Sequence, residues 1–580
     1  MFTEFFKFDL GETMKSNVMQ RCCQKAAKTL VLVSGLISLQ SLAALREDQQ
    51  TYERLLTEVN SQLGMVSQQR SCPGVSLTLT CGNGRCEPER GENETTCPLD
   101  CLNAPIQSYN AQTFCSAVKK VYAPSTQDEV VSIVRDAISA GNHVRAIGHA
   151  HTGNQLICND GVEVSTENLN HILGIEILGG SEVVTVEPGV HLSTLANWLD
   201  QKGKSLGYRL IQFRGVTIAG VLATGSHGSS AKHPSVMAGA IESVTWIGAD
   251  GEKHESSATN TDPETFGALR TNLGMMGIVV QVKLRIQNQF KLEMNLSYQS
   301  DSKLFENNGI INQVSSCDFG QLLWFPHSKK FIQVCGTETQ LPADRGAQNV
   351  MLDPPVPEFV VKPYQLVMHY GACYSGLSCL LEDLRYATLK ILPPFKKTVL
   401  GVPEYVMHLV GWSHQVMTSE LSTKESAVHE KDLEIAVPLS QAQNALSFMA
   451  QRLESNHSCL PLLGVFIRFV ISEDATLIAH TVAQGDFKKG EPAVLFEMPQ
   501  FLPVGLTPQL EEAYQRQYSE VAGGLIKNFK GRAHWGKNDS SIFELQKSLG
   551  RYGDRVERFK SVLQKADPHG VFSNLFLNYL

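Results

Sequence analysis

Between residues 115 and 290, the hydrophobic positions follow two periodicities, one typical of helices and one typical of strands. Residues 125–137 begin with a polar cap and an acidic first turn and then repeat apolar residues at helical spacing. Residues 192–203 show the same apolar spacing and end at glycine. A third helix is predicted to start at Asp262-Pro263. Short apolar, mostly β-branched runs with their turns lie at 117–124, 143–147, 161–165, 169–173, 183–189, 241–251 and 278–286. This alternation predicts a mixed fold of helices and sheets.

Three turns in this pattern are rich in glycine and histidine, namely residues 147–153, 220–228 and 533–538. Glycine lets backbone N–H groups approach a phosphate or a flat cofactor ring closely, and histidine can bind a metal, transfer a proton or carry a covalent group. Neither the Gly-x-Gly-x-x-Gly unit nor the Gly-x-x-x-x-Gly-Lys-Ser/Thr loop occurs in the sequence. One such turn alone is most often structural, but glycines dispersed over three turns indicate an extended ligand that crosses several loops.

The composition is that of an ordinary globular protein, with 42% hydrophobic and 19% charged residues in a chain of 580. This length allows two or three domains. The formal net charge is −8, and the sequence has no basic stripe with interleaved aromatic residues. Both features argue against a nucleic-acid-binding surface. We therefore expect no nucleic-acid partner.

The first 44 residues have the organisation of a secretory signal peptide. Basic residues at 15, 21, 25 and 28 precede the apolar run 30–39, which leads to the small residues at 41–44. The run is short for a membrane span, and no second long apolar segment follows. We expect a cleaved signal and a protein secreted or held in the secretory lumen. An uncleaved N-terminal segment, with membrane association, is the alternative.

Cysteine usage agrees with export. A polar spacer at 45–71 precedes residues 72–104, which hold five cysteines and too few apolar residues for a core. A disulfide-held module is therefore predicted there, with a zinc site as the alternative. Of 14 cysteines, two lie in the leader and an even 12 remain, with candidate bridges between Cys317 and Cys335 and between Cys373 and Cys379. Possible glycan acceptors are Asn93, Asn295, Asn456 and Asn538, and use of Asn538 is doubtful so close to the third Gly/His turn.

The order of these features resembles the FAD-binding domain of the vanillyl-alcohol-oxidase-type flavoproteins, and most closely their aldonolactone and alditol oxidase branch. The resemblance covers roughly residues 115–290 and resumes at 460–500 and 530–580. It implies FAD as the cofactor and an α+β fold with a two-subdomain FAD-binding domain of the PCMH type. The implied parts are this FAD domain, an α+β substrate cap domain and a C-terminal segment that returns to the FAD domain, at 115–289, 290–530 and 531–580.

The first Gly/His turn corresponds to the family's Gly-x-Gly-His-Ser, in which the histidine carries the flavin covalently. The run here is Gly148-His-Ala-His-Thr152, so the covalent histidine maps to His151, and His149 replaces a usually small residue. His149 is expected behind the linkage, and His227 either contacts the cofactor or only holds its own turn. The resemblance implies as cofactor-binding residues Ile147, Gly148, His149, Ala150, His151, Thr152, Gly220, Thr224, Gly225, Ser226, His227, Gly228, Gly274, Gly277, Ile278, His534 and Lys537.

The third turn carries the His-Trp-Gly-Lys signature of the same branch, and residues 566–574 match its terminal segment. The resemblance implies that Lys537, and Arg468 on a cap-domain strand, are catalytic cations beside the N1–C2=O edge of the flavin. Negative charge gathers at that edge as hydride arrives at N5. For Arg468 an ion pair within the cap is the alternative.

Three positions depart from this pattern, and they bear on the substrate. Phe466 stands where alditol oxidases have a glutamate, and Glu497 offers a carboxylate where they have threonine; a surface position for Glu497 is equally open. Gln212 aligns with a serine that contacts the substrate. We name Glu497 and Gln212 as candidate catalytic residues beside the two cations. The exact substrate cannot be carried across from the resemblance.

The resemblance implies an FAD-dependent oxidoreductase that takes hydride from a CH–OH group of a sugar lactone or polyol and uses O2 as acceptor, giving H2O2. Ile211 aligns near a position where a small residue helps oxygen approach, so a dehydrogenase remains open. The alternatives are a covalent-flavin enzyme acting on another carbohydrate or a secondary metabolite, and a non-catalytic secreted binding protein. No metal is expected.

Overall fold

The computed structural model describes residues 105–109, 113–211, 215–351, 382–383, 385–387, 389–390, 393–419, 428–455, 464–503 and 508–580. The chain divides into two units, and all of the described residues belong to the second. This unit consists of residues 76–355 together with residues 365–580. The predicted signal peptide, spacer and cysteine-rich module, together with Gln212, Cys373 and Cys379, lie outside the described residues. Within those ranges, no helix has the length and apolar character needed to cross a membrane.

A small parallel sheet forms the first part of the predicted FAD-binding domain. Its strand order is β3-β5-β4 (Lys120–Tyr122, Val162–Ser165 and Val144–Ile147), and α4 (Gln127–Ser139) packs against one face. The helix starts where the pattern predicts, because the Thr126 side chain accepts a hydrogen bond from the backbone N–H of Glu129. The first Gly/His turn leaves β4 at its carboxyl end.

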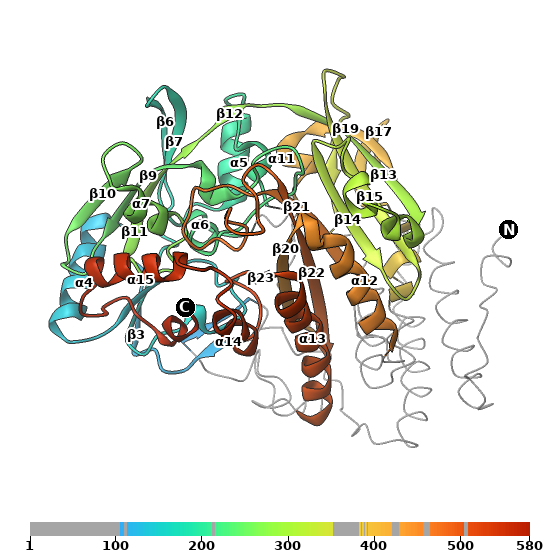
Figure 1. Ribbon diagram of the computed structural model, residues 1–580. Helices are drawn as coiled ribbons and strands as arrows, with labels where there is room; N and C mark the ends of the chain where they lie inside the picture. The colour runs from blue at the N-terminus through green and yellow to red at the C-terminus, as the bar shows by residue number, and fades with distance from the viewer. Residues whose placement is uncertain are drawn as a thin grey trace, which may run out of the picture. The chain divides into compact units, whose positions relative to one another are not determined.

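The second part of that domain is a five-stranded antiparallel sheet, ordered β10-β9-β11-β7-β6 (Figure 1). The run predicted at 169–173 begins as a turn, in which Leu169 N–H donates to Thr166 O, and only then enters the edge strand β6. Asp262 caps α7 as predicted. The bounds are β6 Ile172–Leu178, β7 Ser181–Val186, α5 Leu192–Asp200, β8 Lys204–Ser205, α6 Ile218–Thr224, β9 Ile241–Ile247, β10 Lys253–Ser257, α7 Pro263–Arg270, β11 Ile278–Arg285 and β12 Gln287–Asn288.

An antiparallel eight-stranded sheet follows, ordered β19-β13-β15-β14-β21-β22-β20-β23, with α12 and α13 packed against β20 (Figure 1). Its last strand is the short β23, so residues that follow it start at the end of this sheet. The bounds are β13 Lys291–Ser300, α8 Gly309–Asn312, β14 Phe319–Phe325, β15 Lys330–Thr339, β16 Gln348–Asn349, β17 Phe395–Val399, β18 Val402–Val406, β19 His408–Trp412, α11 Ser413–Val416, β20 Val428–Pro438, α12 Leu439–Ser455, β21 Val465–Ile471, β22 Pro492–Pro503, α13 Pro508–Phe529 and β23 Arg532–Ala533.

After β23 the chain runs back to the first two sheets. Helix α14 (Ser540–Ser548) is followed by α15 (Arg555–Ala566), which contacts α7. Val571 O accepts a hydrogen bond from Val144 N–H on β4, and Phe572 is buried in the core beside α4. The last fifty residues therefore connect the eight-stranded sheet to the small parallel sheet.

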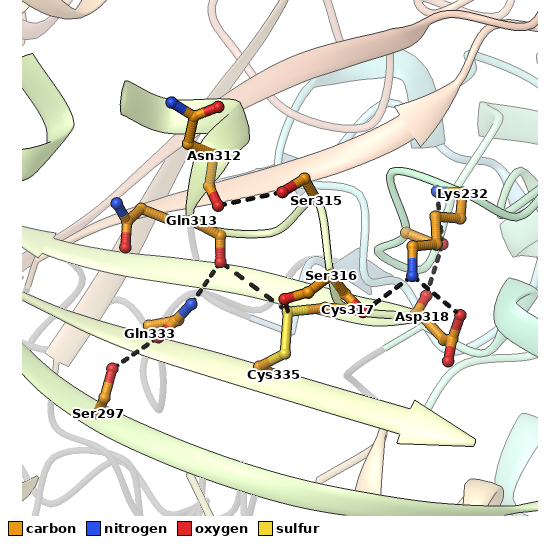
Figure 2. Close-up of a disulfide and its surroundings, with 12 residues drawn as sticks. Lys232, Ser297, Asn312, Gln313, Ser315, Ser316, Cys317, Asp318, Gln333 and Cys335 are labelled. Carbon is orange, nitrogen blue, oxygen red and sulfur yellow. Dashed lines mark hydrogen bonds and ion pairs between the residues drawn. A yellow bond between two sulfur atoms is a disulfide. The ribbon is translucent and has the colours of Figure 1, made fainter. Parts of the chain in front are cut away.

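Two disulfides lie in the described part of the chain. Cys317 and Cys335 are joined as predicted, and they tie the segment before β14 to β15 (Figure 2). Figure 2 also shows Asp318 beside Lys232, so this bridge braces a loop that follows the second Gly/His turn. The other disulfide joins Cys115 to Cys158, a pair that the sequence alone did not single out.

Arg145 on β4 and Glu163 on β5 are register partners, and both are buried on the face of the small sheet opposite α4. Arg145 Nη2 donates to Leu273 O at 2.7 Å, whereas its Nε and Nη1 are buried without a hydrogen-bond partner among the described residues. Burial raises the pKa of Glu163 to about 8, and the charge of Arg145 offsets only part of that shift. Glu163 is therefore mostly a neutral acid at pH 7.

We expect Glu163→Gln to change the pH dependence of stability. Because the folded-state pKa of Glu163 is raised from 4.5 to about 8, its contribution is fully present below pH 4.5 and is lost as the pH rises through 8. The variant should match the wild-type unfolding free energy near pH 5 and exceed it at pH 9. Urea titrations at both pH values measure this, and an equal difference at both would contradict the raised pKa.

Candidate active site

A pocket forms where three distant parts of the chain meet. It is bounded by the first Gly/His turn, by β20 and by the residues after β23, with Tyr109 at its edge. Hydrogen bonds fix the two turns to each other, since Gly153 N–H donates to Gly536 O and Asn154 Nδ2 donates to Trp535 O. The lining residues are Tyr109, His151, Gly153, Lys431, Asp432, Gly536, Lys537, Asn538 and Asp539.

Lys537 is one of two lysines that line this pocket, and Lys431 is the other. Lys537 Nζ lies 2.9 Å from Asp432 Oδ2 and 3.0 Å from Glu434 Oε2, and it also donates to Glu497 Oε1. Burial by itself would lower the pKa of Lys537, but Asp432, Glu434 and Glu497 together raise it well above its usual value. Lys537 is therefore a permanent ammonium group, which can donate hydrogen bonds but cannot act as a base.

A second cation, Arg468, shares Glu497 with Lys537. Arg468 lies on β21, and its Nη2 is 2.7 Å from Glu497 Oε2 on the neighbouring β22. Burial would raise the pKa of Glu497, but Arg468 and Lys537 lower it, so this carboxylate stays charged. Glu497 is buried between the two cations, which settles against the surface position that the sequence left open. Arg468 therefore forms the ion pair that the sequence offered as an alternative. The same pair places Arg468 next to Lys537, since both cations contact Glu497.

The position of Glu497 also explains the departure at Phe466. These two residues are register partners on β21 and β22, so they lie directly opposite each other across the sheet. Side chains on opposite register partners share one face of a sheet. A carboxylate is therefore present beside Arg468, although it comes from the neighbouring strand rather than from position 466.

Glu434 on β20 links this charged group to a set of buried histidines. Its Oε1 is 2.9 Å from His227 Nε2 and 3.3 Å from His480 Nε2, while Oε2 faces Lys537. Burial would raise the pKa of Glu434, but Lys537 and His227 hold it well below its usual value. Sequence reasoning missed both Glu434 and His480. The signal for Glu434 was available, since Asp432 and Glu434 are two acids at alternate positions of an apolar strand.

The His227 ring is held between two acceptors. Its Nδ1 faces Gly228 O at 2.8 Å and its Nε2 faces Glu434 Oε1 at 2.9 Å. These two contacts fix the orientation of the ring beside Glu434.

His227, Glu434, His480 and His534 could in principle hold a metal ion, since each has a ligand atom within 4.8 Å of the others. Their hydrogen bonds indicate a proton network instead. Gly536 N–H donates to His534 Nδ1 at 3.1 Å. Burial holds the pKa of His534 well below its usual value, so its single proton is on Nε2 and that atom cannot ligate. We assign no metal to this group.

His151, the predicted flavin anchor, lies beside this charged group in the same pocket. Burial lowers its pKa to about 3, with further lowering by His149 and His191 against a backbone hydrogen bond at Gly215. The ring is therefore neutral at physiological pH. His149 stacks behind it, with ring centroids 5.3 Å apart, and its half-exposed side chain does not line the pocket. His149 therefore lies beside the predicted anchor and outside the pocket, and its supporting role stays a prediction.

Three of the remaining predicted cofactor residues are glycines that a larger residue could not replace without strain. Gly148 approaches Thr217, the residue before α6, so closely that an added Cβ would lie 2.0 Å from Thr217 Oγ1. Gly274 lies against Arg145, and Gly277 adopts a positive φ that any other residue would find strained. Their cofactor contacts stay predictions. Asn538 is buried and donates to Glu434 O and His534 O, which supports the doubt about a glycan there.

Two known families match consecutive parts of the chain. Residues 118–257 match the family described as FAD binding domain, and residues 282–580 match the family described as D-arabinono-1,4-lactone oxidase. L-gulonolactone oxidase of Bos taurus is 24% identical over 487 residues, which cover 80% of this chain and 96% of that protein. A probable L-gulonolactone oxidase 1 of Arabidopsis thaliana is 26% identical over 519 residues, with 82% of each chain covered.

Solved structures with the same fold include two cholesterol oxidases. One is described as a solvent-stable cholesterol oxidase, with a TM-score of 0.66 and 16% identity, and the other comes from B. sterolicum, with a TM-score of 0.66 and 17% identity. Each match covers 82% of this chain and 96% of the other. At this level of identity the likeness shows the fold, which is the predicted FAD-binding fold with a second α+β part.

Proposed function

The chain belongs to the D-arabinono-1,4-lactone oxidase family, and we propose that it oxidises a CH–OH group of a sugar lactone or polyol. FAD is the hydride acceptor, and O2 takes the electrons from it to give H2O2. The observation that carries this proposal is the buried set of Lys537, Arg468 and Glu497, in which Lys537 also lines a pocket together with His151. Fixed charges of this kind stabilise charge that develops only during the reaction.

The residues present fit FAD. Arg145 keeps two buried N–H groups without a partner among the described residues, and they lie next to Gly274 in the segment that the resemblance assigns to the adenine half. A polar dinucleotide beside this guanidinium would satisfy them, because buried donors normally find an acceptor. The first Gly/His turn and α6 would hold the middle of the cofactor, and His151 would hold the ring at the pocket.

The chain's own groups divide the work at the reacting carbon. Bound FAD supplies the acceptor for the hydride. Lys537 and Arg468 supply two positive charges, and both are paired with the buried carboxylate of Glu497. Asp432 lines the pocket and is the carboxylate that we propose takes the hydroxyl proton at its oxygen. Glu497 holds both cations in place.

We also propose that His151 is joined covalently to FAD, because its neutral ring is the form that can make a new bond. Purified wild-type protein should keep its yellow flavin after acid precipitation, and His151→Ala should release all of it. His149→Ala is the matched control, since His149 stacks on the anchor but lies outside the pocket, and it should retain most of the bound flavin. Full release from wild type would rule out the covalent bond, and absence of any flavin absorbance would overturn the function itself.

A dehydrogenase is the second candidate, favoured by one residue. Ile211 is bulky and almost fully buried near the position where related oxidases have a small residue. Peroxide yield per substrate oxidised, compared in air and with an artificial electron acceptor, separates the two. A panel of aldonolactones, alditols and other sugars in the same assay would identify the substrate class and distinguish it from secondary metabolites.

Secretion is a further proposal, supported by two disulfides in the described part of the chain. Disulfides persist mainly in oxidising compartments. Expression with and without residues 1–44, followed by N-terminal sequencing of protein from medium and cells, tests cleavage of the leader against an uncleaved anchor.

A further inference from the structure

A short hairpin precedes the part of the chain that matches the FAD binding domain. Strand β1 (Ile106–Gln107) pairs antiparallel with β2 (Phe114–Cys115). Ser108 and Thr113 close it, with a backbone hydrogen bond from Ser108 N to Thr113 O and another from Thr113 N to Ser108 Oγ. The family match begins only at residue 118. The hairpin thus lies in front of the matched domain.

This hairpin contacts the first Gly/His turn at three points. Tyr109 N–H donates to Ala150 O at 2.9 Å, and Thr113 Oγ1 donates to Gly153 O at 3.0 Å. The Tyr109 ring lies 4.3 Å from the ring of His151, tilted by 40°. Tyr109 therefore packs against one side of His151, the predicted anchor. The backbone N–H of Tyr109 and the hydroxyl of Thr113 hold the backbone on either side of His151.

Tyr109 also reaches the reacting end of the site. It lines the same pocket as Asp432 and Lys537, which come from the eight-stranded sheet and from the residues after β23. A half-buried aromatic ring at this point limits the space available beside Lys537. One residue from the hairpin thus faces both the anchor and the proposed substrate position.

The Cys115–Cys158 disulfide fixes the hairpin covalently to this place. Cys115 ends β2, and Cys158 follows the short helix η3 (Gln155–Ile157) just after the turn. Cys115 packs with Val118 and Ile157 in a small separate core that also includes Ala150. The bridge closes a 43-residue loop that contains β3, α4, β4 and the entire turn. A disulfide stabilises such a closed segment mainly because it reduces the number of conformations that the unfolded segment can adopt.

We propose that the hairpin β1–β2 is a wall of the active site, held by Cys115–Cys158, in which Tyr109 positions His151 and restricts the substrate space beside Lys537. The positioning of His151 rests on its proposed covalent role; the restriction of the substrate space does not. Small displacements of a reacting group are costly, since misplacement by about 1 Å can lower rates by roughly 100-fold.

Tyr109→Ala tests the wall, with Tyr109→Phe as its matched control. Removing the ring should lower the fraction of FAD that stays bound to the protein after acid precipitation. It should also raise KM for a small lactone about tenfold, with a smaller change in kcat. An aromatic contact of this kind changes an equilibrium constant by roughly a factor of ten at most. Tyr109→Phe keeps the ring and should stay near wild type in both. The melting temperature of each variant, measured in parallel, distinguishes a local effect from general unfolding.

The bridge is tested by the double variant Cys115→Ser/Cys158→Ser, compared with Cys317→Ser/Cys335→Ser. Each loses one disulfide, but neither cysteine of the second pair lines the pocket or touches the hairpin. We expect the first double variant to reproduce the covalent-FAD loss and KM rise of Tyr109→Ala, and the second to keep wild-type values. Equal effects of both would overturn the bridge as a specific clamp.

The outcomes for the wall and for the anchor are separable. Wild-type FAD fraction and KM in Tyr109→Ala would overturn the proposed wall. A rise in KM with no change in covalent FAD would support the proposal that Tyr109 restricts the substrate space. The same result would overturn the proposal that Tyr109 positions His151. If wild type itself releases all its FAD, the covalent proposal fails, while KM in Tyr109→Ala still decides whether the ring limits the substrate space.

Discussion

Replacing Lys537 with methionine should reduce kcat/KM by about 10²–10³-fold, the usual effect of removing one fixed group that stabilises developing charge. The loss has a second cause, because Asp432 and Glu434 would lose this ammonium group and Glu497 would face Arg468 without it. Methionine has a similar length and fills irregular space well, so the packing should survive. Steady-state kinetics with the best substrate of the panel, following peroxide or dye reduction, measures the change.

Lys283→Met is the matched control for this prediction. Lys283 pairs with Glu176 at 3.0 Å on the five-stranded sheet, outside the pocket, and the chemical change is the same. We expect wild-type kinetics from it. Lys537→Arg should fall between the two, because it keeps the charge but replaces a compact ammonium by a planar group. A Lys537→Met enzyme that keeps more than a tenth of wild-type kcat/KM would remove Lys537 from the catalytic residues.

Replacing Glu434 with alanine should lower the unfolding free energy by about 3–5 kcal/mol, the typical cost of removing one partner from a buried ion pair. The side chain is fully buried and accepts from Lys537 and His227 at once. Its removal would leave buried Lys537 and His227 without this acceptor and would also open a cavity. Urea unfolding of the FAD-loaded enzyme, followed by tryptophan fluorescence, gives the difference.

Glu182→Ala is the corresponding control on the surface. Glu182 pairs with Lys204 at 2.6 Å, and 38% of its side chain is exposed. Such pairs contribute about 0–1 kcal/mol because solvent screens them. If Glu434→Ala unfolds with a loss as small as that of Glu182→Ala, the carboxylate does not hold the histidines and Lys537 together.

Local features of the fold were predictable from the sequence because their causes are local. The cap of α7 at Asp262 and the strand alternation around 278–286 depend on residues within one or two turns of each other. Lys537 and Arg468 could be named because short signatures surround them. Their common neighbour Glu497 could be named but not placed, since its position depends on the register of β21 against β22.

The centre of the site could not be assembled in the same way. His227 and Glu434 are 207 positions apart, and His480 and His534 reach the same carboxylate from two further segments. No local pattern encodes which buried polar groups will meet at such distances. The pairing of Cys115 with Cys158 has the same origin, because an even number of cysteines permits many connectivities. Tyr109 was missed because no motif surrounds it in the sequence, and its interest comes from its contact with the ring of His151.

The cross-strand placement of Glu497 opposite Phe466 has a consequence for the order in which these two positions can be changed. Removing Glu497 first would leave Arg468 without the carboxylate that it pairs with, and breaking a buried pair costs several kcal/mol. Introducing a glutamate at position 466 first would keep a carboxylate beside Arg468 throughout, because register partners share one face of the sheet.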